Sequence, residues 1–376
     1  MIAVSLVLAA LVAGAAVYSV LVIAAARNYL AGKPAAEGPP APVSVLKPLA
    51  GAEDELEKNL RSFFEQDYPE FELIFAVRDS SDPACPLVER LQGEYPDVPS
   101  RLVVTGEPPY ANTKVFSLDC MARLARYDLL VMSDSDIRAR PDMLRSIASE
   151  FGNPRLGLLT CPYRAVPGKS LWSRLEALGM NTDFWAGVLA ARLIEGMRFA
   201  VGPTTAARRQ AVEDAGGFES LKDFLAEDFV LGSRVAGAGW QVGLSRYVVE
   251  HHIGSQPLRA NFRHRLRWVR STRRSRPAGY VGQIFTYPVP LLLILLAWAP
   301  GWWPAAFPVL MLRSLAAAAV AGWVLGDPLC RKWWWLIPLE DLLSFMFWIA
   351  GFFGNSIEWR GRRYRLLPDG RFELQP

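Results

Sequence analysis

Two long uncharged stretches constrain this chain more than any other feature. Residues 1–26 contain no charged side chain and are rich in Ala, Val and Leu. No charged residue occurs from Pro277 to Leu312 either. An apolar run of about 20 residues is long enough to cross the ~30 Å hydrocarbon core of a bilayer as a helix. The sequence therefore predicts a protein held in a membrane by both ends of its chain.

The N-terminal stretch, residues 1–30, is expected to be a transmembrane anchor. A cleaved signal peptide is the alternative, but it would have a basic start and an apolar run of only about 7–15 residues. Arg27 and Lys33 follow the apolar run. Positive residues favour the cytoplasmic side, so the next domain is expected in the cytoplasm. A Pro- and Ala-rich linker at 31–42 separates the anchor from that domain.

The C-terminal apolar region, residues 281–356, is too long for one span. Pro300 and Pro304 interrupt it near the middle. Because proline breaks a continuous helix, two spans are expected, at about 281–299 and 304–325. The C-terminal region is therefore expected to contain at least one helical hairpin.

Charged residues complicate the end of this region. Arg313 lies in the second expected span and must either snorkel or face protein. A third apolar stretch at 333–354 carries Glu340 and Asp341 near its start. Four spans would place the C-terminus opposite the cytoplasm, whereas the basic tail at 357–376 favours the cytoplasm. The number of spans and the basic tail would agree if one C-terminal segment were interfacial or re-entrant.

The middle of the chain, residues 43–258, alternates between two kinds of pattern. Apolar, β-rich runs occur at 43–46, 71–77, 101–105, 128–133 and 156–162, and helical patterns at 53–66, 83–91, 113–126 and 141–151. This alternation predicts an α/β domain with a mostly parallel sheet that helices cover on both faces. In such sheets ligands bind beyond the carboxyl ends of the strands.

Composition excludes several classes of protein. Hydrophobic residues make up 51% and charged residues 21%, which excludes a disordered chain. A net charge of +4 is too small to indicate nucleic-acid binding. The four Cys are scattered without a C-x-x-C pair, so neither a disulfide framework nor a zinc ribbon is supported. Glycine-rich nucleotide motifs of the Rossmann and Walker kinds do not occur.

Acidic residues follow two of the expected strands. Asp134 and Asp136 come directly after the fourth apolar run, and carboxylates at this spacing can hold Mg²⁺ or Mn²⁺ against substrate phosphates. A plain loop is the alternative interpretation. Asp79 and Asp82 follow the second run, where ordinary turn chemistry is the alternative.

A third acidic pair, Glu227 and Asp228, precedes a helical pattern at 229–235. Acidic residues favour helix N-termini, which is the structural interpretation. The functional interpretation is a general base, because a hydroxyl that attacks an anomeric carbon needs a carboxylate within hydrogen-bond reach. Such a reaction would invert the anomeric centre.

A basic segment follows at 259–280. It holds eight Arg and no acid between positions 259 and 276. It is expected to form a juxtamembrane helix that binds anionic lipid head groups. Arg267 and Trp268 are instead expected to face the site, because a guanidinium can pair with a diphosphate through two hydrogen bonds.

Taken in order, these residues resemble the D, D, D, (Q/R)-x-x-R-W signature of ceramide glucosyltransferases, glycosyltransferase family 21, which is close to family 2. The similarity runs from about residue 43 to residue 290 and includes the N-terminal anchor. Each motif is weak alone, but their order and spacing together are specific. The matching positions are Asp82, Asp134, Asp136, Asp228, Arg267 and Trp268.

The resemblance implies a GT-A fold and an inverting transfer from a UDP-sugar to a lipid hydroxyl. It implies that Asp228 is the catalytic base. It also implies that Asp134 and Asp136 bind Mg²⁺ or Mn²⁺. The implied nucleotide-sugar-binding residues are Lys47, Asp79, Asp82, Lys114, Asp134, Glu227, Arg267 and Trp268.

Two departures from the ceramide pattern bear on the acceptor. His264 stands where ceramide enzymes have Gln or Arg, and Thr182 stands near the place of a familiar His. The H-x-x-R-W motif, Pro277-Ala278-Gly279 and the W-R-G-R ending at 359–362 look more like bacterial hopanoid glycosyltransferases. The expected reaction therefore moves N-acetylglucosamine from UDP-GlcNAc to a hopanoid, with UDP-glucose and ceramide as the alternative. The resemblance places the enzyme in the bacterial inner membrane, with its catalytic domain in the cytoplasm and membrane lipids around it.

Two further hypotheses are a processive polysaccharide synthase and a non-catalytic membrane scaffold. The small number of spans argues against the synthase, and the intact carboxylates argue against the scaffold. An apolar face at helical spacing would be either buried core or an interfacial helix that guides the lipid. It consists of Leu171, Leu175, Leu178, Phe184, Trp185, Val188 and Leu189.

Overall fold

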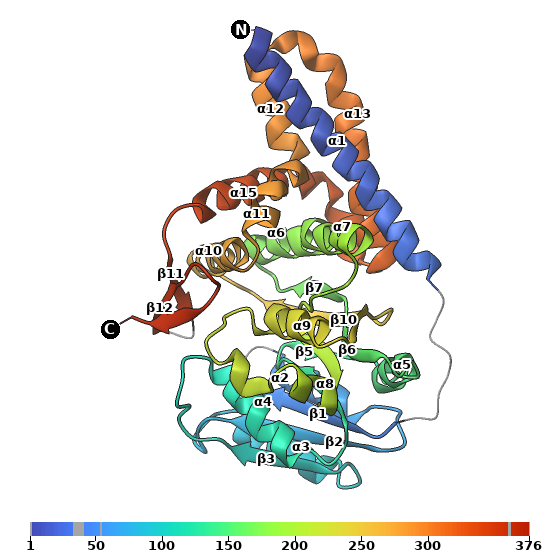
Figure 1. The fold of residues 1–376 in the computed structure, drawn as a ribbon, viewed down its shortest axis with the longest axis vertical. Helices are drawn as coiled ribbons and strands as arrows, with labels where there is room; N and C mark the ends of the chain where they lie inside the picture. Colours follow the sequence, from blue (N-terminus) through green and yellow to red (C-terminus); the bar gives the residue numbers. More distant parts are fainter. Residues whose placement is uncertain (1, 33–40, 53–54, 360–361, 376) are drawn as a thin grey trace.

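The computed structural model describes residues 2–32, 41–52, 55–359 and 362–375. An α/β domain occupies one end of the molecule and long apolar helices occupy the other, with shorter helices between them (Figure 1). This arrangement confirms the expected α/β class with apolar helices toward both ends of the chain. Most of the expected linker, residues 33–40, lies outside the described residues.

The central sheet has seven strands in the order β3-β2-β1-β4-β8-β6-β9. The strands are β1 (Val43–Pro48), β2 (Phe71–Val77), β3 (Ser100–Val104), β4 (Leu129–Ser133), β6 (Leu156–Thr160), β8 (Thr204–Arg208) and β9 (Gln241–Leu244). Strands β3, β2, β1 and β4 are parallel to one another, as are β6 and β9, whereas β8 runs antiparallel to both its neighbours. The sheet is therefore mostly parallel, as the alternation predicts.

Helices cover both faces of the sheet. They are α2 (Leu56–Phe64), α3 (Cys85–Glu94), α4 (Thr113–Leu124), α5 (Met143–Glu150), α8 (Arg209–Asp214), η2 (Phe218–Leu221) and α9 (Glu227–Gly237). Successive strand residues point to opposite faces, so Val45 packs in one apolar core and Leu46 in the other. Strands buried on both faces explain why the sequence shows continuous apolar runs.

A second, three-stranded sheet lies between the seven-stranded sheet and the helices that follow β7 in the chain (Figure 1). Its strands are β5 (Ile137–Arg138), β10 (Val249–Gly254) and β7 (Tyr163–Pro167). A long helix follows, made of α6 (Leu171–Gly179), the π-helical turn η1 (Met180–Phe184) and α7 (Trp185–Glu195). Most of the apolar face expected here is buried core, including Leu178 and Trp185, whereas Leu171 is exposed.

Two helices among the described residues are long and apolar enough to cross a membrane, α1 (Ile2–Ala31) and Pro300–Val324. The latter comprises η4 (Pro300–Ala305), α13 (Ala306–Ala317) and η5 (Ala318–Val324). The expected span at 281–299 lies in a bent pair of helices, Pro277–Thr286 and Pro288–Trp298, with an angle of 62° between its parts, and the pair is a third candidate span when counted as one. These parts are α11 (Pro277–Gly282), η3 (Gln283–Thr286) and α12 (Pro288–Trp298). Pro288 lacks a backbone N–H, so it begins a new helix better than it continues the old one.

The third apolar stretch folds differently from a span. It forms α14 (Pro328–Trp333), η6 (Trp334–Leu336) and α15 (Ile337–Gly351), and α15 lies crosswise to α1, α12 and α13 (Figure 1). The chain then ends in a small sheet of β11 (Ser356–Trp359), β12 (Arg362–Leu366) and β13 (Phe372–Leu374). This sheet lies on the α/β-domain side of the molecule, far from the N-terminus (Figure 1). That one C-terminal segment is interfacial or re-entrant stays a prediction.

The basic segment is the helix α10 (Leu258–Ser275). Six arginines in this helix or directly after it donate hydrogen bonds to other parts of the protein. They are Arg263, Arg265, Arg270, Arg273, Arg274 and Arg276. Arg270 and Arg273 donate to carbonyl groups just beyond α15, including those of Phe353 and Gly354. Helix C-termini carry unpaired carbonyls and partial negative charge, which guanidinium groups stabilise. Five of these arginines therefore join α10 to α15 and the C-terminal tail, and Arg276 joins the end of the helix to Glu195 of α7.

Arg313 faces protein within its apolar helix. It is 5% exposed, and its Nη2 lies 2.6 Å from Asp341 Oδ1, while Nε lies 2.9 Å from Oδ2. Asp183 of η1 lies 3.8 Å from the same guanidinium. The ion pair therefore offsets the cost of a charge in an apolar helix and connects α13 to α15 and η1.

Replacing Arg313 by Met is expected to destabilise the protein by about 3–5 kcal/mol, because Asp341 would stay buried without its cation. The midpoint of thermal unfolding in detergent should fall accordingly. The double variant Arg313→Met/Asp341→Leu should recover most of the loss, and Arg331→Met, at an exposed position, should change little. An Arg313→Met protein as stable as the parent would contradict this account.

Candidate active site

The turn after β4 carries Asp134 and Asp136, and the buried side chain of Lys47 binds its backbone. Lys47 is fully buried, and its Nζ donates to the carbonyl oxygen of Asp134 at 2.8 Å. The ammonium group also lies 3.6 Å from the centre of the Phe63 ring. Burial lowers the pKa of Lys47 to about 7, although the charges of Asp134 and Asp136 oppose this shift. Lys47 thus holds the turn, and its predicted contact with a donor stays a prediction.

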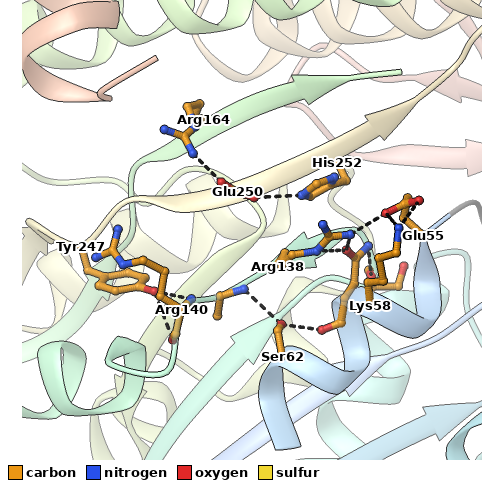
Figure 2. A network of polar contacts seen from close by, with 12 residues as sticks. Glu55, Lys58, Ser62, Arg138, Arg140, Arg164, Tyr247, Glu250 and His252 are labelled. Atoms are coloured by element: carbon orange, nitrogen blue, oxygen red, sulfur yellow. Dashed lines mark hydrogen bonds and ion pairs between the residues drawn. The ribbon is translucent and has the colours of Figure 1, made fainter. Parts of the chain in front are cut away.

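A polar network fixes the same turn from the side of α2 (Figure 2). Arg138, in the strand after the turn, donates to Asn59 Oδ1 at 3.2 Å and to Glu55 Oε2 at 2.9 Å. Asn59 in turn donates to the carbonyl oxygen of Ser135 at 3.3 Å. On the other side, the His252 amide donates to the Asp136 carbonyl at 2.8 Å. The backbone of the turn is therefore held by both α2 and β10.

The side chain of Asp136 pairs with a histidine that the sequence did not single out. His251 Nε2 lies 3.0 Å from Asp136 Oδ2. The His251 charge lowers the pKa of Asp136 against the opposing effect of burial, and Asp136 raises the pKa of His251 against the same effect. Asp136 Oδ1 is buried, and it has no hydrogen-bond partner in the described part of the chain. One carboxylate oxygen is therefore left available to a ligand.

Lys114 joins the other two acidic elements. Its Nζ lies 2.7 Å from Asp134 Oδ1 and 2.9 Å from Glu227 Oε1. Although burial opposes the charged form, these two carboxylates raise the pKa of Lys114 above its ordinary value. Helix α4 brings Lys114 here because Asn112 caps its first turn, with Oδ1 accepting from the Val115 amide at 3.1 Å. The ion pairs connect the ends of β4, α4 and α9.

Asp228 begins α9 beside Glu227, and both its oxygens accept backbone hydrogen bonds. Gly202 N donates to Oδ2 at 2.8 Å and Phe229 N to Oδ1 at 2.7 Å. Gly202 has φ +89°, and a Cβ there would lie 2.9 Å from the Tyr163 ring, so this close approach requires glycine. Burial, and then the charge of Glu227, raise the pKa of Asp228 to about 7. The carboxyl group can therefore accept a proton near neutral pH.

One cavity collects these groups. Its lining includes Lys114, Asp134, Glu227 and Asp228. The structure thus brings together, from segments far apart in the chain, four of the residues that the sequence selects. Phe218 and Leu221 of η2 and Leu231 of α9 form its apolar side.

A series of aromatic contacts connects Tyr163, which lies beside Gly202, to Trp268 of α10. The ring centre of Trp268 lies 5.7 Å from that of Phe184, and Phe184 lies 5.7 Å from Tyr163. Trp268 also lies 5.5 Å from His264, whose Nδ1 is 2.6 Å from Glu176 Oε1. The Trp268 side chain therefore faces the interior, and Arg267 precedes it on α10.

Asp79 and Asp82 form a separate group after β2. Asp82 accepts from Gly51 N at 3.0 Å and from Ala84 N at 2.9 Å, so it ties the loop after β1 to the start of α3. Asp79 accepts from Ser81 N at 2.8 Å. Within the described ranges no hydrogen bond or ion pair connects either residue to Asp134 or Asp228. Their predicted role in nucleotide binding stays a prediction.

The donor set at the turn suits a hard divalent cation shared with phosphates. Asp134 and Asp136 supply carboxylate oxygens, and the unpartnered Oδ1 of Asp136 is one of them. No group of three or more His, Cys, Asp or Glu side chains suited to a metal occurs in the portion of the chain that is described. Two carboxylates therefore fit an ion such as Mg²⁺ or Mn²⁺ that keeps waters and binds substrate oxygens.

Sequence reasoning missed the partners of several of these residues. His251 and Glu176 gave no motif signal, because a lone His or Glu in a strand or helix is usually structural. The C-terminal sheet also reaches the loops around the cavity, and neither composition nor periodicity indicates such a contact. Only the position of Gly202, in a Gly-Pro pair, could have suggested an unusual backbone near the site.

The mostly parallel sheet, with carboxylates at the carboxyl ends of its strands, is typical of α/β domains that bind a ligand at that edge. A mannosyltransferase from Pyrobaculum calidifontis, solved with GDP-Man and Mn²⁺, has a similar fold with a TM-score of 0.55 and 21% identity. The similarity covers 93% of this chain and 97% of that chain. The model of glycosyl transferase family 21 matches residues 6–372, so the chain belongs to that family.

Curated relatives include ceramide glucosyltransferases. Ceramide glucosyltransferase 1 of Caenorhabditis elegans is 27% identical over 230 residues, which cover 61% of this chain and 49% of the relative. A ceramide glucosyltransferase of Komagataella phaffii is 34% identical over 115 residues, covering 30% of this chain and 22% of the relative. The chain spans about half the length of the first of these relatives. The expected resemblance to family 21 is thus confirmed.

The ion pairs of Lys114 predict that Lys114→Met lowers the stability of the protein by an amount that depends on pH. Asp134 would face Glu227 without a cation, so the pKa of Asp134, which burial already raises, should rise further above its value in the unfolded chain. The folded variant would then bind more protons, and its stability should fall as pH rises. We expect a loss of about 3–5 kcal/mol at pH 8 that shrinks toward pH 5.

Unfolding midpoints measured between pH 5 and pH 8 test this prediction. Lys58→Met is the matched control, because Lys58 forms an exposed ion pair with Glu55. A Lys114→Met defect of equal size at every pH would contradict the electrostatic account.

Proposed function

We propose that this chain transfers a sugar from a UDP-sugar to a hydroxyl group of a membrane lipid, with inversion at the anomeric carbon. The observation that carries the proposal is the position of Asp228, a carboxyl group with a raised pKa, in one cavity with Lys114 and Asp134. Inversion in one step requires a base on one side of the sugar and stabilised diphosphate on the other. The cavity offers both kinds of group.

In the proposed reaction, Asp228 accepts the proton of the acceptor hydroxyl. The oxygen then forms a bond to the anomeric carbon while the bond from that carbon to the UDP oxygen breaks. The hydrogen bonds from Gly202 and Phe229 hold the carboxylate in place without neutralising it. UDP leaves with its electron pair, and Arg267 is proposed to contact the diphosphate.

Asp134 and Asp136 are the proposed ligands of Mg²⁺ or Mn²⁺, which would supply positive charge for the diphosphate as it leaves. Lys114 adds a fixed positive charge next to Asp134. The Pyrobaculum mannosyltransferase was solved with Mn²⁺, which supports a divalent ion in this fold. The choice between the two metals is proposed to depend on availability, because both accept oxygen ligands.

The proposed location is the bacterial inner membrane, with the α/β domain on the cytoplasmic side. Arg27 near the end of α1 and the many arginines of α10 both favour that side. The helices α6 and α7 lie between the α/β domain and the apolar helices (Figure 1). A lipid head group could therefore approach the cavity from the membrane while the soluble donor enters from the other side.

For the acceptor we propose a polyhydroxylated hopanoid, with UDP-GlcNAc as donor. His264 supports this choice, because it differs from the Gln or Arg of ceramide enzymes and is joined to Glu176 at 2.6 Å. Ceramide with UDP-glucose is the second candidate, and the names of the curated relatives favour it. The two candidates share the same site chemistry and differ in the lipid.

Product analysis separates the candidates. Detergent-solubilised protein would be incubated with Mg²⁺ or Mn²⁺, UDP-GlcNAc or UDP-glucose, and bacteriohopanetetrol or ceramide, followed by mass spectrometry of the lipids. An N-acetylhexosaminyl hopanoid is expected. A hexosylceramide would overturn the hopanoid assignment, and the absence of product in every combination would overturn both acceptors.

Asp228→Asn should lower kcat by about 10²–10⁴-fold, because an amide cannot accept the proton. The affinity for UDP should stay within about twofold, since UDP does not need the base. In the parent protein kcat/KM should rise with pH and level off above about 7, as Asp228 loses its proton. Asp97→Asn, at an exposed position, is the control, and an active Asp228→Asn protein would remove Asp228 as the base.

A further inference from the structure

The C-terminal sheet lies against two loops that lead to the cavity. One is the loop at 222–226 before α9, and the other is the loop at 105–112 before α4. The first leads directly to Glu227 and Asp228, and the second to Lys114. The last residues of the chain therefore touch the two segments that carry the charged groups of the candidate site.

The contact with the first loop is made by backbone. Phe372 N donates to the carbonyl oxygen of Asp223 at 2.8 Å, and Arg371 and Phe224 form an antiparallel bridge. The Phe224 ring lies 5.4 Å from the guanidinium of Arg234 in α9. The loop before Asp228 is therefore paired like an extra strand with the end of the chain.

The second loop is joined to the first and to the tail. Asn112, the cap of α4, donates through Nδ2 to the carbonyl oxygen of Phe224 at 2.8 Å. Arg362 of β12 donates to Glu107 Oε1 at 3.1 Å. One carbonyl group thus connects the start of α4, which carries Lys114, to the strand-like pairing with Arg371.

An apolar cluster stabilises these contacts. Four buried side chains of the tail form it, and Ala111 and Leu225 from the two loops pack against it. The tail residues are Ile357, Tyr364, Leu366 and Phe372, each no more than 4% exposed. Without the tail, these apolar groups of the loops would face water, so the loops would lose much of their packing.

The tail itself is anchored to the rest of the molecule. Glu358 lies 2.7 Å from Arg263 of α10, and Asn355 lies 2.9 Å from Arg273 Nη2. Helix α10 also carries Arg267 and Trp268. The tail therefore contacts both α10 and the two loops that lead to Lys114 and Asp228. This anchoring distinguishes the tail from a loosely attached extension.

We propose that the C-terminal sheet of β11, β12 and β13 is a positioning element of the donor site, with Phe372 as its central residue. It holds the loops at 105–112 and 222–226 so that Lys114 and Asp228 face the same cavity. This inference rests on the proposed function, because it assigns the sheet a role in binding the nucleotide-sugar. In the proposed function the lipid approaches from the apolar helices, so the KM for the lipid is not expected to depend on the sheet.

Steady-state kinetics of Phe372→Ala test the proposal in the full-length protein. The KM for the UDP-sugar should rise by about tenfold or more because Lys114 is displaced, and kcat should fall because Asp228 is displaced, while the KM for the lipid should stay within about twofold. Phe372→Leu keeps an apolar group and should restore most of the donor affinity. Leu374→Ala is the matched control in the same strand, because Leu374 is 53% exposed. Equal rises of both KM values, or no rise in the donor KM, would overturn the proposal.

Hydrogen exchange of the same variants gives a readout that does not require turnover. In Phe372→Ala the amides of 112–115 and 223–229 should exchange faster, whereas those of the central strands β1 and β4 should not change. Uniform loss of protection would mean that the sheet is only a global stabiliser, and unchanged exchange at the loops would overturn the inference. If no sugar is transferred by any protein but loop exchange still responds, the proposed function fails and the structural coupling stands.

Discussion

The candidate site depends on the two ion pairs that the ammonium group of Lys114 forms with Asp134 and Glu227. Asp134 and Glu227 lie at the ends of elements that are about ninety residues apart in the chain, and like charges at this distance would repel each other. Lys114 lies within 2.9 Å of both and so allows two carboxylates to share one cavity. Its own position depends on the Asn112 cap, which in turn binds the loop before Asp228. The site is thus one connected set of charges and hydrogen bonds.

The junction with the apolar helices follows the same rule that a buried charge needs a partner. Arg313 pairs with Asp341, and Arg265 pairs with Glu340, so the two acids of α15 each have a guanidinium. These pairs join α13, α15 and α10, while η1 contributes Asp183. Apolar side chains alone could slide past one another, whereas paired charges specify one register. Ion pairs therefore fix how α10, α13, α15 and η1 pack together.

The sequence predicted most strands of the parallel sheet because a strand buried on both faces must be continuously apolar. It selected Asp134 and Asp136 as candidate site residues because the carboxyl ends of such strands are where ligands bind. It did not reveal that His251 pairs with Asp136 or that Phe372 packs beside the loop before Asp228. Those contacts join segments more than a hundred residues apart, and local pattern contains no information about such distances.

What the sequence determined by itself was the kind of protein: an α/β domain with apolar helices toward both ends of the chain and acidic residues directly after some of its strands. Periodicity and charge are properties of short segments, so they can be read without coordinates. Tertiary structure alone decided the bend at Pro288, the crosswise position of α15 and the return of the tail to the α/β domain. These features depend on which surfaces pack together, because burial of apolar area and pairing of charges are satisfied only between elements that the fold brings into contact.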